Sequence, residues 1–249
     1  MLAREEKLTE IVRRLQEAAG ENLQSIVLYG SAARGDFHAQ KSDLNLLGVL
    51  RSAKAAELAR IASVVRWWCG PMREPAPRFF TQEELARSAD VFSVELLDIG
   101  EAHRVLFGED PVADIEVPMN LHRVQVEHEL RIALQKLRDH FLRSSDNEHQ
   151  LREVYAKSIS SISVLLRHFL IALGENIPGH KSQVYQRVAE LTGADAGVFD
   201  LGLELRDNHP VTEISRAFGK YLEAIEIVIH SLDALVPKRE WQRVKKQDF

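Results

Sequence analysis

The residues best suited to chemistry lie in two short segments near the N-terminus. One apolar run leads into Gly30-Ser31, and a second opens with Ser42-Asp43 and contains Asn45. Glycine permits a tight turn with a close approach of the backbone to a ligand, and the N–H groups at a helix N-terminus favour a phosphate. Aspartate is an oxygen ligand of the kind that magnesium prefers. The two segments therefore predict a site for a nucleoside triphosphate and its metal.

The spacing in the second segment determines which of its side chains act together. If residues 43–50 form a strand, Asp43 and Asn45 project from one face, and Leu44 and Leu46 project from the other. Metal-dependent phosphoryl transfer uses carboxylates to hold magnesium against the phosphates. Asp43 is then the principal metal ligand and Asn45 a neutral second ligand. The alternative for Asn45 is a polar residue at a strand edge that never meets a metal.

The two segments together resemble the nucleotidyltransferase superfamily, which includes DNA polymerase beta, the aminoglycoside nucleotidyltransferases and the minimal bacterial nucleotidyltransferases. The pattern of that family is Gly-Ser, a short loop with glycine, and then Ser-Asp-x-Asp on a strand. The matching residues are Gly30, Ser31, Gly35, Ser42 and Asp43, with Arg34 as a frequent companion. The segment Arg104–Pro111 is also similar to a stretch that often closes the catalytic domain in bacterial members. The resemblance covers residues 1–115, and its spacing is far more specific than a lone glycine motif.

The resemblance implies magnesium-dependent transfer of a nucleoside monophosphate from a nucleoside triphosphate, with ATP as the expected donor. The acceptor would be a hydroxyl or another nucleophile on an unknown small molecule or protein, and the helical half would help to bind it. The implied nucleotide-binding residues are Gly30, Ser31, Arg34, Gly35 and Ser42. The implied metal ligands are Asp43 and Asn45, and the implied catalytic residues are Asp43, Asn45 and Glu95.

Two departures from the family pattern leave the chemistry open. The second metal-binding aspartate of the family falls at Asn45, and the first strand expected after the central helix, Arg78-Phe79-Phe80, carries no acid. Glu95, on the polar face of a strand expected at Val91–Ile99, is the candidate third acid, and Asp98 is a weaker one. The alternatives to an active enzyme are a catalytically degenerate nucleotide-binding or regulatory protein, and an interaction partner in a toxin–antitoxin-like system.

Two halves with different patterns must position these residues. The first mixes helix and strand signals. Its expected helices lie before Gly20 and over Leu58–Trp68, and its expected strands lie at residues 25–29, 43–50, 78–80 and 91–99. The second half carries wide apolar stripes at helical spacing, which are typical of an antiparallel helix bundle. We therefore expect an α+β fold: a nucleotidyltransferase-like domain at 1–117, a helical bundle at 118–236 and a polar tail at 237–249.

Composition narrows the partners. The chain has 249 residues and a net charge of −5, so no general affinity for nucleic acid or anionic membranes is expected. Its single cysteine, Cys69, excludes an intramolecular disulfide. No apolar stretch approaches the roughly 20 residues that span a bilayer, and the N-terminus has no signal-peptide pattern. We expect a cytoplasmic protein, and the sequence leaves a homodimer open.

Overall fold

The computed structural model describes residues 3–34 and 43–234, in which two compact units divide near residue 121. The fold is α+β, as predicted: a small mixed sheet with flanking helices is followed by a helical region. The predicted loop residues Gly35 and Ser42 and the predicted tail 237–249 lie outside the described residues. Each unit is described by itself.

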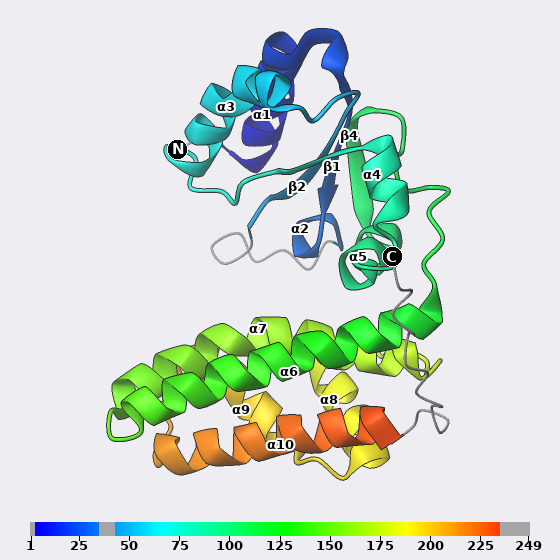
Figure 1. Ribbon diagram of the computed structural model, residues 1–249. Helices are drawn as coiled ribbons and strands as arrows, with labels where there is room; N and C mark the ends of the chain where they lie inside the picture. Colours follow the sequence, from blue (N-terminus) through cyan, green and yellow to red (C-terminus); the bar gives the residue numbers. More distant parts are fainter. Residues whose placement is uncertain (1–2, 35–42, 235–249) are drawn as a thin grey trace, which may run out of the picture. The chain divides into compact units, whose positions relative to one another are not determined.

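The first unit is built around a four-stranded sheet (Figure 1). Its strands are β1 (Leu23–Tyr29), β2 (Asn45–Leu50), β3 (Arg78–Thr81) and β4 (His103–Gly108), in the order β3-β2-β1-β4. β1 pairs antiparallel with both β2 and β4, and β2 pairs parallel with β3. The helices of this unit are α1 (Arg4–Ala19), α2 (Ser31–Arg34), α3 (Ala55–Cys69), α4 (Gln82–Arg87) and α5 (Ser93–Glu101), with a 3-10 turn at Gly20–Asn22.

Two hydrophobic clusters cover the two faces of the sheet. On one face, α1 and α3 pack on alternate residues of the strands, and this cluster includes Leu44, Leu46 and the fully buried Trp68. On the other face, α4 and α5 pack on the intervening residues, among them Leu47 and Val49. Figure 1 shows the two helix pairs on opposite sides of the sheet. The alternation of β2 therefore directs Asn45 to the α4–α5 face, because Asn45 lies two residues before Leu47.

The expected strand at Val91–Ile99 is wrong, because these residues lie mostly in helix α5. The buried residues of α5 are Ser93, Val94, Leu96 and Ile99, and Leu96 and Ile99 belong to the cluster that packs on the sheet. A short apolar run fits either period, and packing against a neighbouring element decides between them. The strand that pairs with the free edge of β1 is instead β4. The sequence pattern predicted no element for the residues of β4.

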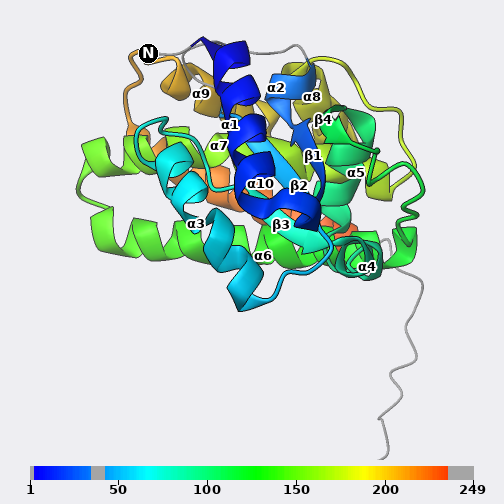
Figure 2. The ribbon, with the colours of Figure 1, turned by 90° about the horizontal axis from the view of Figure 1, so that it is seen from above.

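The second unit is helical, as predicted. Its helices are α6 (Met119–Ser144), α7 (Glu148–Ala172), α8 (Lys181–Thr192), α9 (Ala196–Arg206) and α10 (Ile214–Ala234). The long helices α6 and α7 lie side by side in both views (Figure 1 and Figure 2), and α7 also packs against α8, α9 and α10. Among the described helices, only α7 is long and apolar enough to cross a membrane. Half of its apolar window is buried within the structure.

Candidate functional site

The turn at Gly30 places the first segment of the motif directly against the second. Gly30 follows the last residue of β1 and has a φ of +80°, in the left-handed region that favours glycine. A Cβ atom at Gly30 would lie 3.3 Å from Nδ2 of Asn45. The β1–β2 register also pairs Tyr29 with Asn45. The structure therefore brings the glycine turn and the Asn45 amide together at one end of the sheet.

Asp43 and its neighbours show the alternation that the sequence predicts. Leu44 and Leu46 are each 2% exposed, whereas Asp43 is exposed and Asn45 is half-buried. β2 begins at Asn45, so Asp43 lies two residues ahead of the hydrogen-bonded strand. Asp43 is thus open to solvent two residues before Asn45, as a metal ligand or phosphate-facing group must be.

The helix after the turn is short. α2 begins at Ser31, as expected, but contains four residues, and the Ala33 N–H donates to the Gly30 carbonyl at 2.9 Å. A macrodipole is the sum of many aligned peptide units, so a single turn contributes little of it. Phosphate binding here would depend on individual donors of the loop. The backbones of Ser31 and Arg34 lie in this helix, and their side chains lie outside what the structure describes.

Glu95 lies in helix α5, which packs on the face of the sheet that carries Asn45. We call this face the site face. Oε1 of Glu95 accepts a hydrogen bond from Nη1 of Arg78 at 3.3 Å, and its Oε2 is buried without a partner among the described residues. Arg78 is the register partner of Leu47, and partners in neighbouring strands share a face. Leu47 shares its face with Asn45, so β3 contributes a cation to the same face of the sheet as Asn45. In this ion pair, the positive charge of Arg78 offsets the negative charge of Glu95. A two-metal site would need that negative charge.

A small cavity lies next to this ion pair. It has a volume of about 20 Å³, and its polar lining comes from Tyr29, Arg78, Ser88 and Glu95. Most of the cavity wall is apolar, so a water molecule there would find few polar partners. Burial raises the pKa of the Tyr29 phenol, the Arg78 guanidinium lowers it, and Glu95 raises it again. Tyr29 therefore stays a neutral hydroxyl beside Asn45 and Glu95. The sequence analysis missed it, although it directly precedes Gly30.

β4 adds a histidine at the same end of the sheet. His103 is the β4 register partner of Tyr29, and its Nε2 lies 2.9 Å from Oδ2 of Asp110. Its Nδ1 lies 2.8 Å from the carbonyl of Ile99 at the end of α5. Burial alone would raise the pKa of Asp110, but hydrogen bonds from the Val112 N–H and from His103 outweigh it and hold that pKa below its usual value. Because both ring nitrogens have partners, His103 joins β4 to α5.

The donor set fits one magnesium ion rather than two. Magnesium is commonly bound through one or two carboxylates together with substrate phosphates. Asp43 supplies one carboxylate and Asn45 one amide oxygen. Across residues 3–34 and 43–234, no three His, Cys, Asp or Glu side chains gather into a preformed metal cage. A metal would therefore arrive with the nucleotide, held by Asp43, Asn45 and the phosphates.

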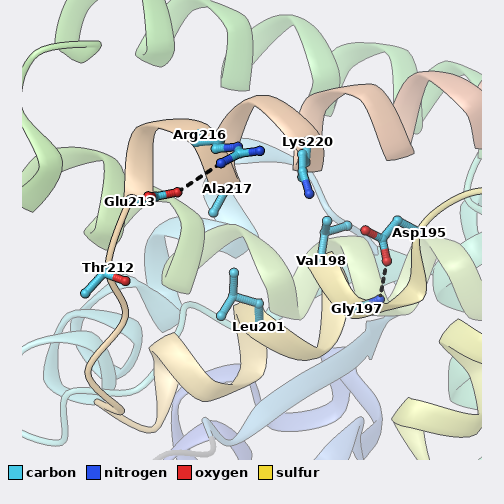
Figure 3. A pocket seen from close by; sticks show the side chains of 9 residues that line it. All are labelled: Asp195, Gly197, Val198, Leu201, Thr212, Glu213, Arg216, Ala217 and Lys220. Atoms are coloured by element: carbon cyan, nitrogen blue, oxygen red, sulfur yellow. Dashed lines mark hydrogen bonds and ion pairs between the residues drawn. The ribbon is translucent and has the colours of Figure 1, made fainter.

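The helical unit has two hollows of its own. Figure 3 shows the first, of about 360 Å³, where the start of α9 faces the start of α10. Asp195 accepts from the Gly197 N–H at 2.9 Å and caps α9, and Arg216 pairs with Glu213 at 3.3 Å. In the first hollow, Asp195 thus serves as a helix cap and Arg216 pairs with its near neighbour Glu213, while Lys220 also lines the wall.

The second hollow is a groove of about 600 Å³ between α6 and α7. Leu137 and Leu165 line its apolar part, and ionisable side chains such as Glu129 and Lys136 also line it. The resemblance implied that the helical half helps to bind the acceptor. Of the two hollows described, this groove is the larger.

No family model matches the sequence, and no curated protein matches it. Among solved structures, the chain is similar to the spectinomycin adenyltransferase AAD(9) from Enterococcus faecialis, solved with ATP and spectinomycin. That match has a TM-score of 0.60 and 13% identity, and it covers 93% of this chain and 100% of the other. A toxin–antitoxin structure solved with AMP-PNP matches 53% of this chain and 95% of its own at 13% identity, with a TM-score of 0.32, a likeness too slight to bear on the fold. The chain has a nucleotidyltransferase-type fold.

Proposed function

We propose that the protein is a nucleotidyltransferase that moves a nucleoside monophosphate, with ATP as the expected donor, onto a hydroxyl or another nucleophile of a separate acceptor. The observation that carries the proposal is the contact between the Gly30 turn and Asn45, beside the exposed carboxylate of Asp43. This is the arrangement that a triphosphate and its metal require. The likeness in fold to an adenyltransferase solved with ATP supports it.

Each residue has a distinct task in this reaction. Asp43 and Asn45 are the residues that would hold Mg²⁺ through their side-chain oxygens, and a bound Mg²⁺ would neutralise phosphate charge. The triphosphate would be oriented by Gly30, Ser31, Arg34, Gly35 and Ser42. The acceptor oxygen bonds to the α-phosphorus, the bond from that phosphorus to the bridging oxygen breaks, and pyrophosphate leaves. The acceptor proton passes to Glu95, whose Oε2 is buried without a partner in the part of the chain that the structure describes.

Pyrophosphate release tests this function. The protein is incubated with Mg²⁺, each labelled nucleoside triphosphate and a panel of hydroxylated and amine acceptors, and pyrophosphate and labelled product are measured. We expect turnover, with ATP as the best donor, and loss of turnover in Asp43→Ala. Asp90→Ala is the matched control, because Asp90 is an exposed aspartate of the same unit outside the site. Turnover that survives Asp43→Ala would exclude this site.

A second function follows from the charges of the site. Asn45 brings no negative charge, and Arg78 stands on the site face of β3 where an acid is expected. A protein that binds nucleotide without consuming it would have these features. A ligand at a hundred times its dissociation constant stabilises the folded state by about 2.7 kcal/mol, which a thermal-shift screen detects. Binding without turnover, together with tighter magnesium-dependent binding in Asn45→Asp, favours this regulatory function, and clear turnover rules it out.

The cellular location and the oligomeric state of the protein are also part of the proposal. We expect it to act in the cytoplasm, where ATP and magnesium are available. A homodimer would be detected as a doubled mass in light scattering after size-exclusion chromatography.

A further inference from the structure

Two basic side chains of helix α1 contact segments next to the candidate site. One reaches α2, and the other reaches the loop of Met72 and Glu74. Arg4 and Lys7 lie one turn apart, so they share a face of the helix. The Arg4 guanidinium donates to the carbonyl of Ala32 in α2, just after the Gly30 turn. Lys7 donates to Oε1 of Glu74 at 2.5 Å and to the carbonyl of Met72 at 3.0 Å. Neither basic residue belongs to the motif.

Glu74 carries the second connection into the motif itself. Its Oε2 accepts the backbone N–H of Leu44 at 3.0 Å, and Leu44 is the residue between Asp43 and Asn45. The side chains of Lys7 and Glu74 are only 12% and 10% exposed. An almost buried carboxylate thus joins an ammonium group to the peptide that precedes β2. Hydrogen bonds to charged groups of this kind are shorter and stronger than neutral ones.

The loop that carries Glu74 is itself held in place. Trp68 is fully buried and donates from Nε1 to the carbonyl of Pro75 at 2.9 Å, and the Glu74 N–H donates to the Trp68 carbonyl at 3.2 Å. Arg73, just before Glu74, has a φ of +58°. A bulky residue in the left-handed region costs energy and persists only where the surroundings enforce it. Glu74 is therefore presented to Leu44 by a rigid turn.

We propose that Lys7 and Glu74 are positioning residues, which hold the Asp43–Asn45 segment in the orientation that binds the metal and its nucleotide. Leu44 precedes the first ladder residue of β2, so its N–H needs a partner outside the sheet. A buried charge pair is a costly means of supplying one acceptor, and an ordinary carbonyl would satisfy the same N–H. What the charged pair adds is a fixed direction for the peptide between the two ligand residues. This inference rests on the proposed function.

The test uses the full chain and three variants. Glu74→Ala removes the acceptor of the Leu44 N–H, Glu74→Gln keeps an acceptor and loses the charge, and Lys7→Met removes the ammonium. Glu83→Gln is the matched control, because Glu83 forms an ion pair with Arg87 in the same unit, where both side chains are largely exposed. Magnesium-dependent ATP binding is measured by calorimetry, hydrogen exchange of the Leu44 amide by NMR, and folding by thermal melting.

We expect Glu74→Ala to weaken ATP binding about tenfold, a change of about 1.4 kcal/mol, and to speed exchange of the Leu44 amide. Glu74→Gln and Lys7→Met should weaken binding about twofold to fivefold, and Glu83→Gln should change nothing. A folded Glu74→Ala protein with wild-type affinity would overturn the positioning role. If Glu74→Ala does not fold, unchanged affinity in both of the other variants overturns it. A wild-type protein that binds no nucleotide overturns the proposed function, and this inference with it.

Discussion

Replacing Gly30 with alanine should weaken nucleotide binding by more than the loss of stability explains. The new Cβ would sit on a residue with a φ of +80°, a conformation that costs an alanine about 1–2 kcal/mol. It would also lie 3.3 Å from Nδ2 of Asn45. That contact is tighter than ordinary packing, so the amide must move by a few tenths of an ångström.

Gly193→Ala separates these two effects. Gly193 ends α8 in the left-handed conformation with a φ of +79°, and its added Cβ would meet no described atom within 4 Å. Both variants should therefore lose about 1–2 kcal/mol of unfolding free energy. In a chain of this size, each kcal/mol lowers Tm by about 2–4 °C. Only Gly30→Ala should also displace a ligand residue.

The assay compares the two variants in urea unfolding and in calorimetric titration with ATP and magnesium. We expect similar unfolding losses and an ATP affinity that falls about threefold to tenfold in Gly30→Ala alone, since small misplacements at a binding centre are costly. Equal affinities in the two variants would refute the reasoning, because Asn45 would then not contribute to binding.

Three further changes test the fold, two of them in the first unit and one in the helical unit. Gly108→Ala places a Cβ 1.9 Å from a backbone oxygen of β1, at a φ of +77°, so it should cost about 2–5 kcal/mol in urea unfolding; a loss below 1 kcal/mol would contradict the β1–β4 register. The pKa of Asp110 is held below its unfolded value, partly by His103. The stability that this adds is complete above the unfolded pKa of about 3.9 and is lost as the pH falls through the lower folded pKa. Asp110→Asn should therefore show a flatter stability profile below about pH 4 in acid titration monitored by circular dichroism, and a profile as steep as that of wild type would disprove it. Tyr155→Phe leaves the buried carbonyl of Val198 without its 2.6 Å donor, so the urea midpoint should fall by the equivalent of about 1–3 kcal/mol; an unchanged midpoint would show that water replaces the hydroxyl.

The sequence correctly predicts those helices and strands whose apolar residues repeat with an unambiguous period. The helix expected before Gly20 is α1, in which Leu8, Ile11 and Leu15 are buried and Val12 is half-buried. The strand signals near residues 25–29 and 43–50 correspond to β1 and β2. The segment at 91–99 failed because a short apolar run fits both periods. Its helical stripe was selected by packing on Val27 and Leu47 of the sheet, which no local pattern contains.

The same contrast between local sequence pattern and tertiary packing applies to the candidate site. The spacing of Gly30, Asp43 and Asn45 already indicates where a phosphate and a metal would meet. Lys7 and Glu74 could not be found in this way, because they lie 67 residues apart in the chain and belong to no motif. Arg78 stands in a strand that was predicted, but its place on the site face follows only from the parallel register with β2.

Local geometry was therefore readable from the sequence, because a turn that needs glycine and a strand that alternates are set by neighbouring residues. Which distant side chains share that location was decided by the tertiary structure alone. Pairing and burial place Glu95 beside Arg78 and Tyr29, at 3.3 Å from the guanidinium, and place the Glu74 carboxylate on the Leu44 N–H. Under the proposed function, the charges that would decide whether a bound nucleotide is also consumed come from strand register and helix packing in the first unit.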